Sequence, residues 1–366
     1  MTSRERALAA LSRRLPDRLP MWETQFWPET LTRWRQEGLP ADADPVTYFG
    51  LDPVACINDL FEPSFGLPAR TLEETADFRI HVDGYGKTVK TWLRVTRPRN
   101  LLEPAVRTPA DWKRLKPHLR PTPERFNNPA AEAAYRAAIT AGHFTAITPV
   151  EPMWFVLHQT MGFELGLVAV MKQRDMIADM VGTYTDYLLA MLELTEARGY
   201  RFDALWFWSD LCYRNGMLFS PQLARELLLP HWQRIGRFLH ARGMRFIFHC
   251  DGNVGQLIPL LIEAGCDAVH PLEARAGNDV REYKRRFGDR ICLIGNINAD
   301  VVGSNDPAAI EQEVAEKIPV AASGGGYIYH IDHSVPPAVA LESYGHLLEC
   351  VRRYDPTGRI GFGEGN

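Results

Sequence analysis

The chain has 366 residues, of which 46% are hydrophobic and 23% charged, and its formal net charge is −4. This is enough apolar material for a large core, and the chain is long for one domain unless that domain is a barrel or a large α/β unit. The lack of a basic tract argues against nucleic acid as a partner, and no apolar stretch approaches the roughly 18–20 residues of a membrane span.

The amino-terminal segment TSRERALAALSRRLPDRLP predicts an ordinary first helix that ends by Pro16. It lacks the continuous apolar region of a secretory signal, and Thr2 and Glu5 have the spacing of a capping box. The six cysteines form no CxxC pair, and most of them sit in apolar runs such as ICLIG. This pattern favours reduced, buried thiols in a cytoplasmic protein.

Eight short apolar runs alternate with longer segments of helical period, such as PQLARELLLPHWQRIGRFLHARG. Eight strands with helices between them predict a closed (β/α)8 TIM barrel that spans residues 1–366 as one domain. An open, doubly wound sheet is the alternative, but no glycine-rich turn follows the first run. The runs cover residues 19–26, 54–61, 144–152, 203–210, 245–252, 267–273, 291–298 and 327–333.

The irregular part of the chain runs from about residue 62 to residue 140. Within it, RIHVDGYGKTVKTW at 79–92 predicts a β-hairpin around DGYG, followed by a Pro- and Arg-rich stretch. We interpret this part as an insertion between the second and third strands.

Polar side chains end every one of the eight runs, and the active sites of such barrels lie at the carboxyl ends of the strands. We therefore predict an enzyme with an active site there. The polar residues are Glu23, Gln25, Asn58, Asp59, Glu151, Asp210, His249, Cys250, Asp251, Glu273, Asn296, Asn298, His330, Asp332 and His333.

The run FIFHCDGNV at 246–254 places three potential metal ligands side by side. Side chains alternate across a strand, so His249 and Asp251 share one face and Cys250 takes the other. We expect the His/Asp pair to face the site and Cys250 to pack outward beside Phe246 and Phe248.

Several motifs carry a resemblance to the uroporphyrinogen decarboxylase superfamily, among them PDRLPMW, TPVEPMWFVLHQTMGFE, HCDGNV, GCDAVHPLEARAGNDV and GGGYIYHIDHSVPP. The resemblance covers nearly the whole chain and implies that family's (β/α)8 barrel. True uroporphyrinogen decarboxylases hold an anionic tetrapyrrole with arginines in an RQAGRY-like motif. Here the matching stretch is WETQFWPET, which has no arginine, although Asp59 resembles the family's substrate-binding aspartate. Uroporphyrinogen decarboxylation is therefore not expected.

The chain is more similar to the corrinoid-dependent methyltransferase branch of the superfamily. In the thiol-transferring enzymes of that branch, an H-x-C motif and a later cysteine hold zinc. The resemblance places His249 on the histidine, Asp251 on the first cysteine and His333 on the later one. It implies a metal site with harder ligands, which suit an oxygen or nitrogen substrate better than a thiol.

The leading hypothesis is a methyltransferase-like enzyme that demethylates a small methoxy or methylamine substrate onto a corrinoid protein. The corrinoid would be carried on a separate protein, because the chain has no D-x-H-x-x-G motif. Two alternatives stay open: a metal-independent decarboxylase or lyase acting on a small carboxylate, and a non-catalytic ligand-binding barrel. A homodimer is compatible with all three.

We assign roles to the predicted site residues on this hypothesis. Zinc would be held by His249, Asp251 and His333, with Glu151 as the fourth contact. The further candidates are Glu151, Asp210, Glu273 and His330 for catalysis, and Glu23, Gln25, Asp59, Trp154 and Asn296 for substrate binding.

Overall fold

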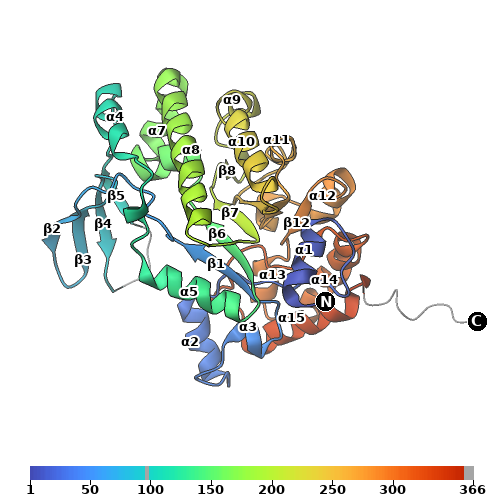
Figure 1. Cartoon of the computed structure of the whole chain (residues 1–366). Coiled ribbons are helices and arrows are strands. Elements are labelled where there is room, and N and C mark those ends of the chain that lie inside the picture. Colours follow the sequence, from blue (N-terminus) through green and yellow to red (C-terminus); the bar gives the residue numbers. More distant parts are fainter. Residues whose placement is uncertain (95–98, 358–366) are drawn as a thin grey trace, which may run out of the picture.

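The computed structural model describes residues 1–94 and 99–357. At its centre is a curled sheet of seven parallel strands in chain order, with helices packed along its outer side (Figure 1). Seven of the eight predicted strands are thus present in the predicted order. They are β1 (Val54–Asn58), β6 (Phe144–Thr148), β7 (Ala204–Trp208), β10 (Arg245–His249), β11 (Ala268–His270), β12 (Cys292–Ile294) and β13 (Tyr327–Ile328).

The first predicted run, residues 19–26, does not form a strand. Only Met21 and Phe26 make isolated bridges, to Tyr329 and Val335. Proline at position 20 has no N–H to donate, so it pairs only through its carbonyl, which accepts the N–H of Tyr329 at 2.9 Å. The segment is nevertheless fixed by Trp22, which donates its N–H to Tyr329 O at 2.9 Å.

The helices confirm the reading of the amino terminus, since Thr2 and Glu5 form the capping box of α1. No helix among the described residues combines the length and the apolar character needed to span a membrane. The helices are α1 (Ser3–Leu11), α2 (Pro28–Gln36), α3 (Pro45–Tyr48), α4 (Pro109–Leu115), α5 (Pro129–Thr140), α6 (Pro152–Trp154), α7 (Phe163–Lys172), α8 (Arg174–Ala197), α9 (Pro221–Leu227), α10 (Leu229–His240), α11 (Ile258–Glu263), α12 (Val280–Phe287), α13 (Ala299–Gly303), α14 (Pro307–Ala322) and α15 (Leu341–Tyr354), with the π-helix η3 (Phe155–Thr160) and the 3-10 turns η1 (Lys116–His118), η2 (Pro123–Arg125) and η4 (Ala274–Ala276).

The segment between β1 and β6 carries a separate antiparallel sheet of four strands to one side of the curled sheet (Figure 1). Its middle pair is the hairpin expected around DGYG. Residues 95–98 of the predicted insertion lie outside the described residues. The strands are β2 (Arg70–Glu74), β3 (Phe78–Val82), β4 (Thr88–Trp92) and β5 (Asn100–Glu103), and a two-stranded ribbon follows β7 as β8 (Cys212–Tyr213) and β9 (Gly216–Met217).

The hydrophobic core has two layers, separated by the curled sheet. Side chains on the concave face, such as Trp206 and Ile247, pack with Ala10 and Leu11 of α1. Side chains on the convex face pack under the outer helices. Since Arg4 of α1 pairs with Asp203, just before β7, α1 covers the amino ends of the strands. The opposite end, where the polar residues gather, is therefore the end available for a site.

Candidate functional site

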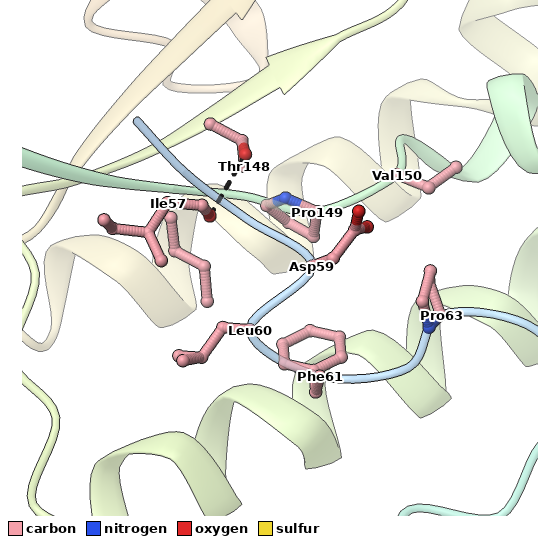
Figure 2. A pocket seen from close by; sticks show the side chains of 9 residues that line it. Ile57, Asp59, Leu60, Phe61, Pro63, Thr148, Pro149 and Val150 are labelled. Atoms are coloured by element: carbon pink, nitrogen blue, oxygen red, sulfur yellow. Dashed lines mark hydrogen bonds between the residues drawn. The ribbon is translucent and has the colours of Figure 1, made fainter. Parts of the chain in front are cut away.

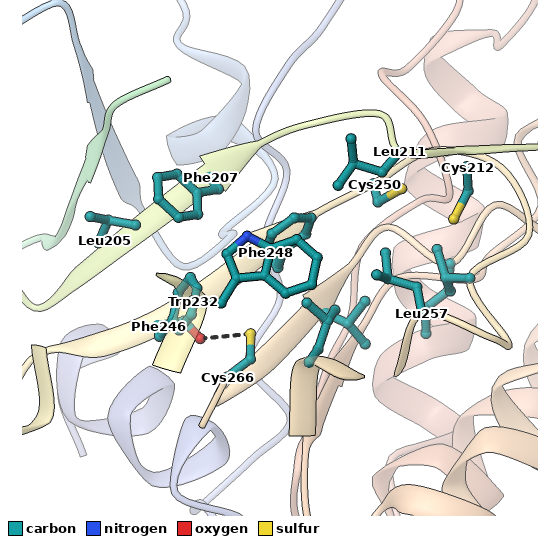
Figure 3. Close-up of a cluster of buried hydrophobic side chains, with 14 of the residues drawn as sticks. Leu205, Phe207, Leu211, Cys212, Trp232, Phe246, Phe248, Cys250, Leu257 and Cys266 are labelled. Atoms are coloured by element: carbon teal, nitrogen blue, oxygen red, sulfur yellow. Dashed lines mark hydrogen bonds between the residues drawn. The ribbon is translucent and has the colours of Figure 1, made fainter. Parts of the chain in front are cut away.

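The side-chain alternation predicted for residues 246–251 is confirmed by the packing. Phe246, Phe248 and Cys250 belong to the outer layer of the core, whereas Ile247 belongs to the inner one. Figure 3 shows Cys250 beside Leu211 and Cys212, in the same cluster as Phe248. Burial raises the pKa of the Cys250 thiol well above its ordinary value. Cys250 therefore acts as a small packed side chain, and His249 faces the inside of the sheet.

Strand register brings aromatic side chains to the same level as His249. His249 at the end of β10 is paired with Trp208 at the end of β7 and with His270 at the end of β11. The Trp208 and His249 rings are stacked, with centroids 4.5 Å apart and planes at 28°. The three rings thus form a row across the carboxyl ends of adjacent strands.

Two carboxylates converge on the outer nitrogen of His249. Its Nε2 lies 3.4 Å from Asp210 Oδ1 and 3.7 Å from Asp251 Oδ1. One ligand atom from each of the three residues lies within 4.8 Å of the others. Oδ1 of Asp251 is buried and has no hydrogen-bond partner within the described part of the chain. An unsatisfied buried oxygen is costly, so the arrangement fits a bound cation or a substrate group.

The two carboxyls are placed in different electrostatic environments. Burial raises the pKa of Asp210, but the hydrogen bond and charge of His249, together with the N–H of Asp251, outweigh it and the net shift is downward. Burial also raises the pKa of Asp251, and the nearby charge of Asp210 adds to the rise, so its net shift is upward. Two acids whose environments separate their pKa values are characteristic of functional sites.

The inner nitrogen of His249 is held by a second histidine. The Nδ1 atoms of His249 and His270 lie 2.8 Å apart, so one proton lies between them. Burial and three neighbouring histidines lower the pKa of His270 well below its ordinary value. His270 is therefore the neutral acceptor, and His249 donates from Nδ1. For His249, burial lowers the pKa, but the bond to Asp210 and the charge of Asp251 raise it overall.

The row of histidines continues through His330 to the segment that contains Glu23 and Thr24. The rings of His270 and His330 meet edge to face, 4.5 Å between centroids. Thr24 donates its N–H to His330 Nε2, and the same nitrogen lies 3.6 Å from Glu23 Oε2. Burial lowers the pKa of His330 to about 4, so His330 is a neutral member of this buried polar row.

The Asp210–His249–Asp251 cluster has the dimensions of a metal site. Zinc lies about 2.0–2.2 Å from nitrogen and oxygen ligands, which separates tetrahedral ligands by roughly 3.4 Å. The distances of 3.4 and 3.7 Å from His249 Nε2 match that spacing. The Nδ1–H of a metal-bound histidine is normally donated to an outer partner, a position that His270 fills. These residues fit a divalent ion.

The structure brings together a different group of potential metal ligands from the one predicted. Asp210, predicted as a catalytic residue, is the third member of the cluster, and His333 is not in it. His333 follows β13, which is three strands away from β10 in the sheet. Its electrostatic interaction with Asp251 and Glu273 is a small contribution to their pKa shifts beside the effect of burial.

Glu151 is not the fourth contact that the sequence suggested. Its carboxylate is fully buried and accepts hydrogen bonds from Trp232 Nε1 and from the N–H of Met153, each at 2.8 Å, and from Ser209 Oγ at 3.0 Å. Trp154 donates a further N–H to the same carboxylate. All of these donors belong to the scaffold, so Glu151 anchors α6 to α10 rather than facing a substrate.

Asn296 is likewise a scaffold residue instead of a substrate contact. It is fully buried, and its amide donates to Leu272 O and Asn278 O while it accepts from the N–H of Val280. Glu273 lies at the edge of the site and accepts from Gly252 N at 2.9 Å and Arg275 Nε at 2.6 Å. Its carboxylate borders the cluster without joining it.

The remaining substrate candidates are spread around the mouth. Asp59 lines a small pocket with Leu60, Phe61 and Pro149, where Figure 2 shows its carboxylate beside Pro149. Gln25 is exposed and accepts a hydrogen bond from Ser334. Trp154 is half-buried and stacks on His158 at 4.8 Å between ring centroids. The structure does not gather these residues into one binding surface.

Three site residues were missed by the sequence reasoning: Trp208, His270 and His158. His270 follows the apolar residues of DAVHPLE just as His249 follows the apolar residues of RFIFHCDG, and this was the available signal. His158 lies in the π-helix η3, and its electrostatic interaction with Asp210 is a minor contribution to the pKa of Asp210 beside burial and His249. π-Helical turns are frequent at functional sites, but none can be recognised from this sequence.

Comparison with known proteins places the chain in a family. A family model described as Uroporphyrinogen decarboxylase (URO-D) matches residues 94–354. Uroporphyrinogen decarboxylase of Coxiella burnetii (strain Dugway 5J108-111) is 28% identical over 143 residues, 38% of each chain. The corresponding protein of Pectobacterium carotovorum subsp. carotovorum (strain PC1) is 34% identical over 99 residues, 27% of each chain. These matches span less than two fifths of the curated relatives' length.

Among solved structures, a methyltransferase from Methanosarcina mazei has a TM-score of 0.60 to this chain at 16% identity. The match covers 97% of this chain and 99% of that one. At this identity the likeness shows a shared fold.

Proposed function

We propose that this chain, which belongs to the uroporphyrinogen decarboxylase family, is a methyltransferase-like enzyme that demethylates a small methoxy or methylamine compound. The methyl group would pass to a corrinoid on a separate protein. The observation that carries the proposal is the convergence of Asp210, His249 and Asp251 at the carboxyl ends of β7 and β10. The structural neighbour is named a methyltransferase, which agrees with the proposed class.

We further infer that the curled sheet is the wall of a (β/α)8 barrel with residues 20–22 in the eighth position. Met21 bridges to Tyr329, directly after β13. On its other side, Asp52 just before β1 donates its N–H to Met21 O at 2.8 Å. The short segment therefore has hydrogen-bonded neighbours on both sides. In such a barrel all strand ends, and hence the cluster, would surround one mouth.

The proposed reaction needs a group that stabilises the leaving heteroatom. The methyl–oxygen or methyl–nitrogen bond breaks with its electron pair left on the heteroatom, and the methyl group is taken by the reduced corrinoid. A zinc ion held by Asp210, His249 and Asp251 would supply Lewis-acid stabilisation at that atom. His270 fixes the His249 ring by accepting its Nδ1–H, which directs Nε2 toward the two carboxylates.

The charge of the site favours a small substrate over an anionic tetrapyrrole. Asp210, Asp251 and Glu273 gather near His249, and the stretch WETQFWPET contains no arginine. Several substrate carboxylates would meet like charges there, which is unfavourable. We therefore propose that the chain does not decarboxylate uroporphyrinogen.

The proposal can be tested with free cob(I)alamin as a stand-in for the corrinoid protein. Purified protein loaded with zinc is incubated with cob(I)alamin and a panel of methoxylated aromatic compounds and methylamines. Formation of methylcobalamin, followed by its absorbance, is expected for one member of the panel. His249→Ala should lower that rate by at least the roughly 10²–10⁴-fold typical of a lost catalytic group. Asp186→Asn on the exposed surface of α8 is the matched control.

The role of the metal is tested separately by elemental analysis. One equivalent of zinc per chain should be lost in both His249→Ala and Asp251→Ala, and retained in Asp186→Asn. Full turnover after chelation would contradict the metal role and favour proton transfer through His249 and His270. If the whole panel gives no methylcobalamin while a small carboxylate loses CO2, the methyltransferase proposal is wrong.

A further inference from the structure

A second group of potential metal ligands lies between the helices α14 and α15. These two helices pack against each other over much of their length (Figure 1). Glu311 of α14 and His346 and Cys350 of α15 each bring one ligand atom within 4.8 Å of the other two. His346 and Cys350 are four residues apart, so they stack on one face of the helix.

From this geometry we propose a second metal site, in which Glu311, His346 and Cys350 bind a zinc-like divalent ion. Cys350 Sγ and His346 Nε2 are 3.5 Å apart, which is close to the separation of sulfur and nitrogen ligands around zinc. A thiolate and an imidazole select a borderline or soft ion over magnesium or calcium, which require oxygen ligands. This proposal does not depend on the function proposed above.

The surrounding groups support the carboxylate and the histidine. Glu311 Oε1 accepts from Arg353 Nη1 at 2.8 Å and from the Tyr354 hydroxyl at 2.9 Å, which orients the carboxylate. His346 Nε2 lies 3.1 Å from Pro307 O. In the metal-free chain the Nε2–H of His346 donates to that carbonyl, so binding of an ion at Nε2 requires this proton to move to Nδ1. The carbonyl is then free to serve as a further oxygen contact.

A path for the ion exists on the side of His346. This side chain lines an open pocket bordered by Glu37, Glu342 and Glu349. Acidic groups around an opening concentrate cations near it. Behind His346, Cys350 is buried, and burial together with the charge of Glu311 raises the pKa of its thiol. A cation bound between Cys350 and Glu311 would offset the repulsion between the Cys350 thiolate and the Glu311 carboxylate.

Cobalt(II) titration of the full-length chain distinguishes this site from the one at the strand ends. A cobalt–thiolate bond gives a charge-transfer band in the near ultraviolet, whereas carboxylate and imidazole ligands do not. We expect this band in the wild-type chain and in His249→Ala, which lacks the first cluster. It should disappear in Cys350→Ser, and Glu311→Gln should weaken cobalt binding by more than about tenfold. Asp186→Asn, an exposed residue on α8 that does not line this pocket, should leave the band unchanged.

Circular dichroism of each variant shows whether it is folded. If Cys350→Ser does not fold, the weaker cobalt binding expected of Glu311→Gln still tests the proposal. A wild-type chain without the band would overturn the proposal. A band that survives in folded Cys350→Ser would also overturn it, and would place the thiolate at another cysteine. Loss of methyl transfer in the assay above, with the band intact, would affect only the proposed function.

Discussion

Replacing Glu23 with glutamine should stabilise the protein, and increasingly so as the pH rises. Glu23 is almost completely buried, and its Oε1 accepts the N–H of Ile331 at 3.1 Å. Burial raises the pKa of this carboxyl to about 8, although the bond from Ile331 and the hydroxyls of Tyr344 and Tyr329 oppose the rise. The ordinary value is 4.5, so folding becomes linked to uptake of a proton.

The sign follows from counting protons. Between pH 4.5 and pH 8 the folded state holds a proton at Glu23 that the unfolded state has lost, so the free energy of unfolding falls as pH rises. With 1.36 kcal/mol per pH unit, the penalty is roughly 2 kcal/mol at pH 6 and roughly 4 kcal/mol at pH 8. Glutamine keeps the shape and carries no charge, so it avoids this cost at every pH.

Urea denaturation of the wild type and of Glu23→Gln at pH 5, 6, 7 and 8 measures the difference directly. We expect the variant to be the more stable by an amount that grows by roughly 2 kcal/mol between pH 6 and pH 8. Glu29→Gln, an exposed residue on α2, provides the control and should show little difference between these pH values. A constant difference between wild type and Glu23→Gln would refute the assigned protonation of Glu23.

Three other predictions address the neighbouring residues. Cys250→Ser should cost on the order of 1 kcal/mol of stability, because it places a hydroxyl in apolar packing, and should leave turnover largely intact; loss of turnover in a folded variant would mean that Cys250 acts in the site. Glu151→Ala should lower the free energy of unfolding by several kcal/mol, since Trp232 and the other buried donors lose their acceptor. A melting temperature equal to that of the wild type would contradict the anchoring role of Glu151. Asp210→Asn should remove the largest contribution that raises the pKa of His249. In metal-free protein, the titration midpoint of the His249 ring, followed by ¹H–¹⁵N NMR, should therefore move to lower pH. An unchanged midpoint would show that Asp210 and His249 do not interact.

Local sequence patterns were sufficient to predict those structural features that depend on one short segment of the chain. The alternation in FIFHCD fixed the opposite faces of His249 and Cys250, because the period of two holds for any strand. The capping box of Thr2 and Glu5 also involves only neighbouring residues. The order of the seven parallel strands followed from the alternation of apolar and helical segments.

Other features depend on contacts between segments that are distant in the sequence. The first run alone did not reveal that residues 19–26 make only two isolated bridges, at Met21 and Phe26, instead of a regular strand. The group that could hold an ion contains Asp210 in place of His333, because strand order rather than motif position decides which strand-end residues lie together. The pairing of His249 with His270 required the register between β10 and β11.

The sequence by itself determined the strand and helix segments, the faces of β10 and the end of the sheet at which polar groups gather. The tertiary structure alone decided which of those groups meet and which are taken up by the scaffold. Glu151 shows the reason: only the packing of α10 brings Trp232 within 2.8 Å of its carboxylate. A buried acid must find either a partner or a substrate, and the choice is made by side chains that the local sequence does not contain.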